Sequence, residues 1–296
     1  MKEGTIKRIG RLFRMMQFHH FPKLFLEKNN VRITYTHHLF SEDLGNFDAL
    51  VKYATSKRRV ITPQVFFDSF KKKSFQGDSI LFTFDDGLLS SYCAAKEILS
   101  RYNIKAIFFV PTEILELRTE VQMKEFAVKR IYFNRRKEWS LRKEEYLTMN
   151  KEQLVDLFNE GHMIFPHTHS HCRLRDIKDS QGVQKEIIWP KETLRDLLGC
   201  EIDAFAFPVG TERVVSSYAY SEIKKNYQFC FTGLGGINTV ETDRYFLHRD
   251  CLHANTELSH LRNTLEGSYD LFYLFKMHLL KNVAKDINSR HYKNGG

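Results

Sequence analysis

Short apolar runs alternate along the chain with longer stretches whose apolar residues recur at helical spacing. The short runs predict buried strands at 31–35, 80–84, 106–110, 163–165, 204–207, 229–232 and 246–252. The longer stretches predict helices at 47–55, 63–73, 90–102, 151–160, 185–198, 218–226 and 256–265. Because strands and helices alternate throughout, the sequence predicts an α/β fold, a (β/α) barrel with fewer than eight full units.

Two carboxylates follow the strand predicted at 80–84. Asp85 and Asp86 come directly after Phe84, and Gly87 follows them. Parallel α/β folds place their chemistry at the carboxyl ends of strands, which is where this pair lies. Neighbouring side chains on an extended strand point in opposite directions, so we expect the two carboxylates to have different environments and roles. A strand followed by an ordinary Asp-Asp-Gly turn is the alternative.

Histidines follow a second strand. His167, His169 and His171 come directly after the strand at 163–165. Neutral imidazole is the commonest metal-binding side chain. Two histidines and one carboxylate leave open positions on zinc, which is typical of a catalytic site. Two further histidines, His37 and His38, follow the first strand. One of them faces the pocket, or both are structural or surface residues.

The chain of 296 residues has a formal charge of +9 and five cysteines. The odd number of cysteines, without a Cys-x-x-Cys pair, indicates neither a disulfide framework nor a zinc knuckle, so we expect a reducing compartment. The positive charge suits an acidic partner such as anionic lipid or a phosphorylated substrate, although a solvated basic surface explains it as well. No nucleic-acid-binding motif is present, and we expect no nucleic-acid partner.

The two ends of the chain are basic. Residues 1–30 carry a net charge of +5 (seven Lys or Arg against two Glu) on an amphipathic pattern, which predicts a helix that lies on an anionic membrane or packs on the domain. Residues 268–296 predict a basic helix and tail, and 111–150 an insertion that acts as a lid or a solvated loop. Without a signal peptide or an apolar run long enough to span a bilayer, we expect a cytoplasmic protein, peripheral at the inner face of the membrane.

Three motifs resemble those of the polysaccharide deacetylases, which contain the NodB homology domain and form carbohydrate esterase family 4. Residues 83–87 (Thr-Phe-Asp-Asp-Gly) resemble the first motif, 167–171 (His-Thr-His-Ser-His) the second, and 205–210 (Phe-Ala-Phe-Pro-Val-Gly) the third. The resemblance covers about residues 78–255. It implies a distorted seven-stranded (β/α) barrel, here at residues 31–267, with helical extensions at both ends.

The resemblance also implies roles for individual residues. Asp85 is the implied catalytic base, and Asp86, His167 and His171 are the implied ligands of a divalent metal, for which zinc is the default. Val209 is implied to offer its backbone N–H to the oxygen that becomes negatively charged during the reaction.

Two family features are different here. Many relatives have an arginine two residues before the proline of the third motif, where this chain has Ala206. We hypothesise that Arg249 substitutes for it, and group it with Val209 on the substrate-binding side. The late Leu-x-His motif that supplies the general acid is best matched by His248, our candidate catalytic acid, with His253 as the second candidate.

These features predict a metal-dependent hydrolase that acts on carbon–nitrogen bonds other than peptide bonds. Its expected substrate is an N-acetylated sugar of a polysaccharide, an oligosaccharide or a lipid-linked glycan, from which it removes an acetyl or another small acyl group. The alternative is a catalytically inactive glycan-binding or scaffold protein that has kept the barrel.

Overall fold

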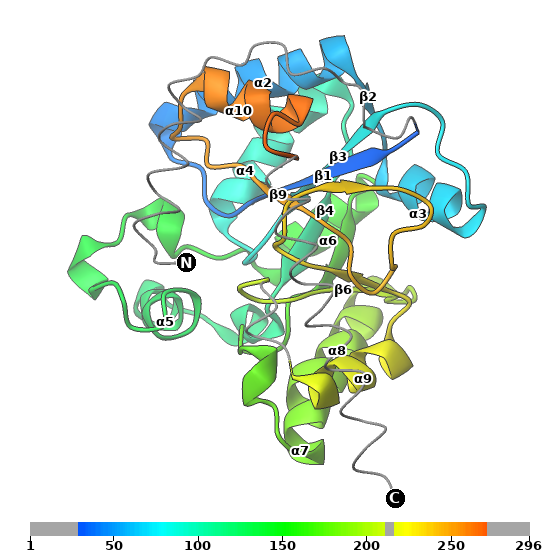
Figure 1. Cartoon of the computed structure of the whole chain (residues 1–296). Coiled ribbons are helices and arrows are strands. Elements are labelled where there is room, and N and C mark those ends of the chain that lie inside the picture. The colour runs from blue at the N-terminus through cyan, green and yellow to red at the C-terminus, as the bar shows by residue number, and fades with distance from the viewer. Residues whose placement is uncertain (1–28, 211–215, 271–296) are drawn as a thin grey trace, which may run out of the picture.

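The computed structural model describes residues 29–210 and 216–270 (Figure 1). The basic helix expected within residues 1–30 and the tail expected from residue 271 onward lie outside the described residues.

One large sheet and one small sheet form the centre of the molecule. The large sheet has seven strands in the order β5-β4-β3-β1-β8, with β2 paired to β3 and β9 to β1. Its members are β1 (Val31–Thr36), β2 (Arg59–Val60), β3 (Ser79–Phe84), β4 (Ile107–Val110), β5 (Met163–Pro166), β8 (Ile237–Asn238) and β9 (Asp250–Cys251). The small sheet pairs β6 (Ala204–Ala206) with β7 (Phe229–Phe231). All of these pairings are parallel except that of β1 with β8.

The mainly parallel pairing confirms the predicted α/β fold. Within the described residues, the ladders form two separate sheets and not one closed barrel. The end of β5 is nevertheless tied to β6, because the His167 ring bonds the backbone carbonyl of Ala206. The arrangement is therefore an interrupted barrel, and one of its interruptions, between β5 and β6, lies beside the histidine motif.

Helices surround the strands (Figure 1). They are α2 (Leu44–Lys57), α3 (Pro63–Lys71), α4 (Leu89–Glu97), α5 (Glu120–Phe126), α6 (Lys151–Asn159), α7 (Ser180–Val183), α8 (Trp189–Leu198), α9 (Ser217–Asn226) and α10 (Leu258–Glu266). The predicted proline start of α3 is confirmed, since the Thr62 hydroxyl accepts a bond from the Val65 N–H. Among the described helices, none is both long and apolar enough to cross a bilayer.

Aromatic side chains fill the core that supports β3. All six residues of β3 are buried, and the Phe84 ring stacks on Phe108 of β4 at a centroid distance of 5.0 Å. Phe47 of α2 packs edge-on against the Phe84 ring. Rigid aromatic packing under the last residue of β3 fixes the direction in which the chain enters Asp85.

Two predicted elements are shorter than expected. The helix expected at 90–102 ends as α4 at Glu97 and continues as a 3₁₀ turn. The strand expected at 246–252 is reduced to β9. The backbone of His248 bonds the Asn238 side chain, which accepts the His248 N–H at 2.8 Å and donates to the His248 carbonyl at 2.9 Å. A side-chain amide replaces a strand neighbour there.

Carboxylates form ion pairs with part of the cations of the basic insertion. Five of its cations form ion pairs, and these are Lys129 with Glu125, Arg130 with Glu113, Arg136 with Glu145, Arg142 with Glu42, and Lys143 with Glu120. Part of the positive charge of the insertion therefore holds the insertion together and onto the domain.

A buried arginine joins the first strand to the last. Arg32 of β1 donates to Asp250 of β9 and to Asp270 beyond α10, both at 2.5 Å, and its side chain is 1% exposed. The two carboxylates are buried as well. Removing the cation would leave both of them without a counter-charge.

We therefore expect Arg32→Met to lower the free energy of unfolding by about 3–5 kcal/mol. Urea denaturation followed by circular dichroism measures it. Arg59→Met is the control, because Arg59 is exposed on β2 and its loss should change little. Equal stability of the two variants would contradict the role given to the buried triad.

Candidate functional site

A cavity of about 290 Å³ opens at the carboxyl ends of the strands. Its lining includes both carboxylates that follow β3, His167 and His171 after β5, and Arg249 before β9. Ile131 and Tyr132 of the insertion complete one wall. Segments far apart in the sequence thus meet where parallel α/β folds place their chemistry.

The backbone separates the two carboxylates. Asp85 continues the strand, since its N–H bonds the Thr36 carbonyl at 2.9 Å. Asp86 then adopts a left-handed conformation (φ 70°), and Gly87 follows at φ 65°. Glycine adopts this positive φ without strain, and a Cβ here would also lie 2.5 Å from the end of the Ile114 side chain, which would have to move. The different environments expected from strand alternation arise instead from this turn.

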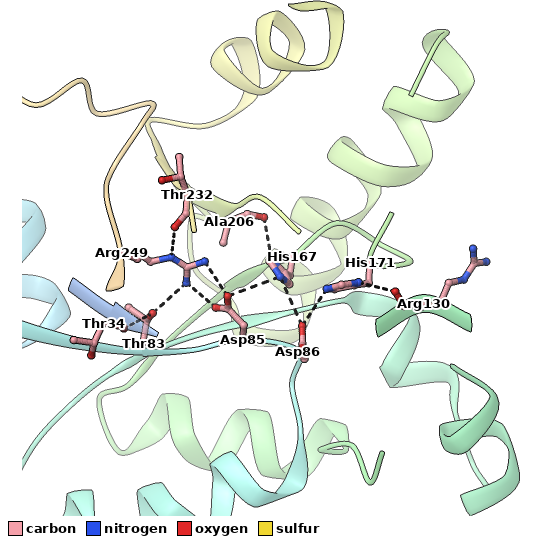
Figure 2. Close-up of polar contacts among 10 residues, drawn as sticks. All are labelled: Thr34, Thr83, Asp85, Asp86, Arg130, His167, His171, Ala206, Thr232 and Arg249. Atoms are coloured by element: carbon pink, nitrogen blue, oxygen red, sulfur yellow. Dashed lines mark hydrogen bonds and ion pairs between the residues drawn. The ribbon is translucent and has the colours of Figure 1, made fainter. Parts of the chain in front are cut away.

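Asp85 is held by a buried arginine. Arg249 donates from both terminal nitrogens to its two carboxylate oxygens, at 2.6 and 2.8 Å (Figure 2). The same guanidinium donates to the Thr83 hydroxyl at 3.1 Å and to the Thr232 carbonyl at 2.8 Å. Four of its five N–H donors are therefore committed to protein atoms, and they fix the plane of the Asp85 carboxylate.

Asp86 faces two histidines. Its Oδ1 lies 3.1 Å from Nε2 of His171 and 3.7 Å from Nε2 of His167. On the far side of each ring, Nδ1 bonds a backbone carbonyl, that of Arg130 for His171 and that of Ala206 for His167 (Figure 2). A carbonyl only accepts hydrogen bonds, so both rings carry their proton on Nδ1 and, when neutral, present an Nε2 lone pair to Asp86.

Three electron-pair donors thus converge in a buried space. The ligand atoms of Asp86, His167 and His171 all lie within 4.8 Å of one another, and all three residues are buried. Burial lowers the pKa of His167 to about 4, so its ring is neutral and able to bind a metal at pH 7. Burial raises the pKa of Asp86, but a doubly protonated His171, which would donate to this carboxylate, outweighs burial together with His37 and His167 and holds that pKa well below its usual range. This donor set fits a divalent metal.

The third motif reaches the same cavity. Val209 lines it, with its backbone in the left-handed region (φ 64°) and its side chain 46% exposed. Gly210 packs against Gly233 so closely that a Cβ would lie 2.3 Å from the Gly233 nitrogen. His248, the sequence candidate for the acid, is not among the residues that line this cavity, whereas His37, His38 and His253 are.

Comparison with known proteins agrees with the motifs. The family model described as polysaccharide deacetylase matches residues 72–227, more than half of the chain. The chain belongs to this family. The resemblance seen in the sequence is therefore confirmed, and membership makes this chain a carbohydrate deacetylase, a hydrolase. A search of curated proteins found no match.

Solved deacetylase structures share the fold. The Streptococcus pyogenes deacetylase PplD, in complex with acetate, is 19% identical with a TM-score of 0.61, over 81% of this chain and 98% of that one. The Bacillus cereus polysaccharide deacetylase BC0361 is 18% identical with a TM-score of 0.59, over 80% and 69%. IcaB from Ammonifex degensii is 19% identical with a TM-score of 0.56, over 80% and 97%.

The deacetylase also holds its histidine loop by a residue that the sequence did not reveal. Glu186 is buried, and its two carboxylate oxygens accept the backbone N–H and the hydroxyl of Ser170, both at 2.9 Å. His169, in the same loop, points away from Asp86, and its Nδ1 lies 3.0 Å from the Thr112 hydroxyl. A lone glutamate in a helical stretch carries no sequence signal for this contact, which spans 16 residues.

We expect His171→Gln and Asp86→Asn each to lower the affinity for zinc at least about 10-fold, because each variant removes one of the three proposed protein ligands. Titration of metal-free protein with zinc, followed by calorimetry, measures the affinity. His169→Gln is the control, since this histidine lies between the two others and outside the triad. Equal zinc affinity in all four proteins would rule out the triad as the metal site.

Proposed function

We propose that this chain is a metal-dependent deacetylase that removes the acetyl group from an N-acetylated sugar. The observation that supports it best is the buried triad of Asp86, His167 and His171, in which two Nε2 lone pairs converge on one carboxylate beside a second, arginine-held carboxylate. A divalent metal bound there would lower the pKa of a water molecule and polarise the acyl carbonyl.

Asp85 is the proposed general base. Its carboxylate lies in the cavity wall, with Oδ2 4.0 Å from the His167 Nε2. Each oxygen keeps a lone pair beyond the bond that it accepts from Arg249. Asp85 would take the proton of the attacking water, and Arg249 would keep the carboxylate plane fixed while it does so. Arg249 acts in this scheme mainly on Asp85, and one remaining N–H is available to a substrate.

The developing negative charge needs a donor as well. We propose the backbone N–H of Val209 for the oxygen that becomes negatively charged. The left-handed backbone at this residue sets the direction of that N–H, and such strain is common where it serves a site.

The leaving amine must receive a proton. His37 and His253 both line the cavity, and their rings stack at a centroid distance of 6.4 Å. We therefore assign the proton donor to this histidine pair instead of to His248. Burial lowers the pKa of His37, but Cys251, Asp86 and Asp85 outweigh burial and raise that pKa to about 9, so this ring carries a proton at pH 7.

The size of the cavity bears on the substrate. A volume of about 290 Å³ is at the lower end of ligand pockets, which hold about 300–1,000 Å³. It suits the acetylated end of one sugar unit, while the rest of a glycan or a lipid anchor stays outside. A lipid-linked sugar is the more specific proposal, because its phosphate would suit the net positive charge of the chain.

The inactive scaffold is the weaker reading. A glycan-binding protein has no use for a carboxylate held by two arginine bonds next to three converging ligand atoms. Such buried, charged groups are costly to keep unless they serve chemistry.

We expect the purified protein, loaded with zinc or cobalt, to release acetate from fully acetylated chitopentaose, and Asp85→Asn to lower that rate at least about 100-fold. Metal content should be unchanged in Asp85→Asn, because Asp85 lies outside the triad, and lost in Asp86→Asn. Acetate assay and elemental analysis on the same samples measure both. Wild-type protein that holds no metal after reconstitution would overturn the enzyme proposal.

A further inference from the structure

The last strand and the first strand bring a cysteine between two histidines. Cys251 of β9 is paired in parallel with Tyr35 of β1, and the Leu252 N–H bonds the Tyr35 carbonyl at 2.8 Å. His37 lies two residues beyond Tyr35, and His253 two residues beyond Cys251. Because side chains alternate along extended backbone, residues two apart share one side, and Tyr35, His37 and His253 on this side line the cavity.

The sulfur of Cys251 is the common partner of this cluster. It lies 3.3 Å from Nε2 of His253. The His37 ring is close enough for the charge on each of the two groups to change the pKa of the other. The planes of the two histidine rings are only 14° apart, as in a stacked pair. Tyr35 packs edge-on against His37, with centroids 5.3 Å apart. The sulfur therefore holds the His253 ring directly, and the His37 ring is held through its stacking on His253.

We propose that Cys251 is a positioning residue for the reaction: its sulfur holds His253, and through the ring stack His37, in the cavity wall, oriented and protonated, so that the pair can donate a proton to the leaving amine. This inference rests on the proposed function, since it names the group that prepares the acid.

The charges support the geometry. Burial raises the pKa of the Cys251 thiol, but the hydrogen bonds and charges of His253 and His37 outweigh it and lower that pKa to about 6. Burial lowers the pKa of His37, but the hydrogen bond to Cys251, together with Asp86 and Asp85, raises it to about 9. At pH 7 the cluster is therefore a thiolate with a protonated imidazole.

Other titratable and charged side chains surround the cluster. Burial, with Cys251 beside it, raises the pKa of Tyr35 well above its usual range, so this phenol stays neutral. Burial lowers the pKa of His38, which leaves that ring neutral. Arg249 stays positive. A bound metal would offset the charge of Asp86, and Arg249 offsets that of Asp85, which leaves Cys251 as the anion that retains the proton on the pair.

The direction of the effect follows from these charges. The acid works only while it carries its proton, so hydrolysis of the amide falls as pH rises through the pKa of the pair. A thiolate at Cys251 keeps that pKa high, and a neutral side chain there lets it fall. An aryl acetate has a leaving group that departs without a proton, so its hydrolysis should not depend on Cys251.

The first experiment compares wild type, Cys251→Ser and Cys251→Asp, each loaded with zinc. With fully acetylated chitopentaose, we expect Cys251→Ser to move the alkaline limb of the kcat/KM profile down by about one pH unit or more, and Cys251→Asp to restore it, because aspartate returns the negative charge. With 4-nitrophenyl acetate, the three proteins should have the same profile. Thermal melting followed by circular dichroism verifies that the variants are folded.

The second experiment needs no deacetylase activity. Iodoacetamide alkylates the thiolate, forming a sulfur–carbon bond with loss of iodide, and peptide mass spectrometry reports each cysteine separately. We expect Cys251 to react with a midpoint near pH 6, and His253→Gln to move that midpoint upward. Burial raises the pKa of the other thiols, which serve as internal controls: Cys93, Cys172, Cys200 and Cys230.

The outcomes separate this inference from the proposed function. Wild type without acetate release overturns the proposed function, whatever the labelling shows. Active wild type with an unchanged alkaline limb in Cys251→Ser overturns the role of Cys251, as does equal loss on both substrates, which is the mark of a structural effect. A shifted limb that Cys251→Asp restores, together with early labelling of Cys251, supports the inference.

Discussion

Two adjacent carboxylates are buried at the end of β3, and each needs positive charge close by. Asp85 receives it from Arg249, which is itself buried and reaches Asp85 across the centre of the fold. Asp86 faces two imidazoles whose protons point away from it, so only a cation between them completes its surroundings. The sheet order brings these charges together, and the chemistry of the site follows from the different ways in which the two charges are balanced.

The price of this convergence is local backbone strain. Asp86, Thr168, His171 and Val209 all have left-handed backbone, although none of them is glycine. Each such residue costs of the order of 1–3 kcal/mol, which the surrounding structure must supply. The buried Glu186 carboxylate on Ser170 and the aromatic packing under Phe84 provide part of that support. Strain concentrated in the three motifs is a sign that they are held for chemistry and not for stability alone.

The parts of this site that depend on neighbouring residues in the chain can be predicted from the sequence. The strand before Asp85, the histidine spacing and the alternation of strands with helices are all read from short windows, and the α/β fold predicted from them is confirmed. The two-residue strands β2 and β8 escape detection, since two residues have no period. The cluster around Cys251 escapes it too, because β1 and β9 pair across more than 200 residues and nothing local specifies that contact.

The insertion shows why composition alone misleads. Its basic residues were expected to form a lid or a solvated loop, yet several of them pair with carboxylates of the same chain. Its contribution to the site is made by the backbone: the Arg130 carbonyl accepts the His171 Nδ1–H and so fixes which nitrogen of that ring faces Asp86. Tyr132, two residues later, lines the cavity. A shift of the insertion would therefore change the orientation of the His171 ring. One hydrogen bond thus couples the metal triad to the cavity wall.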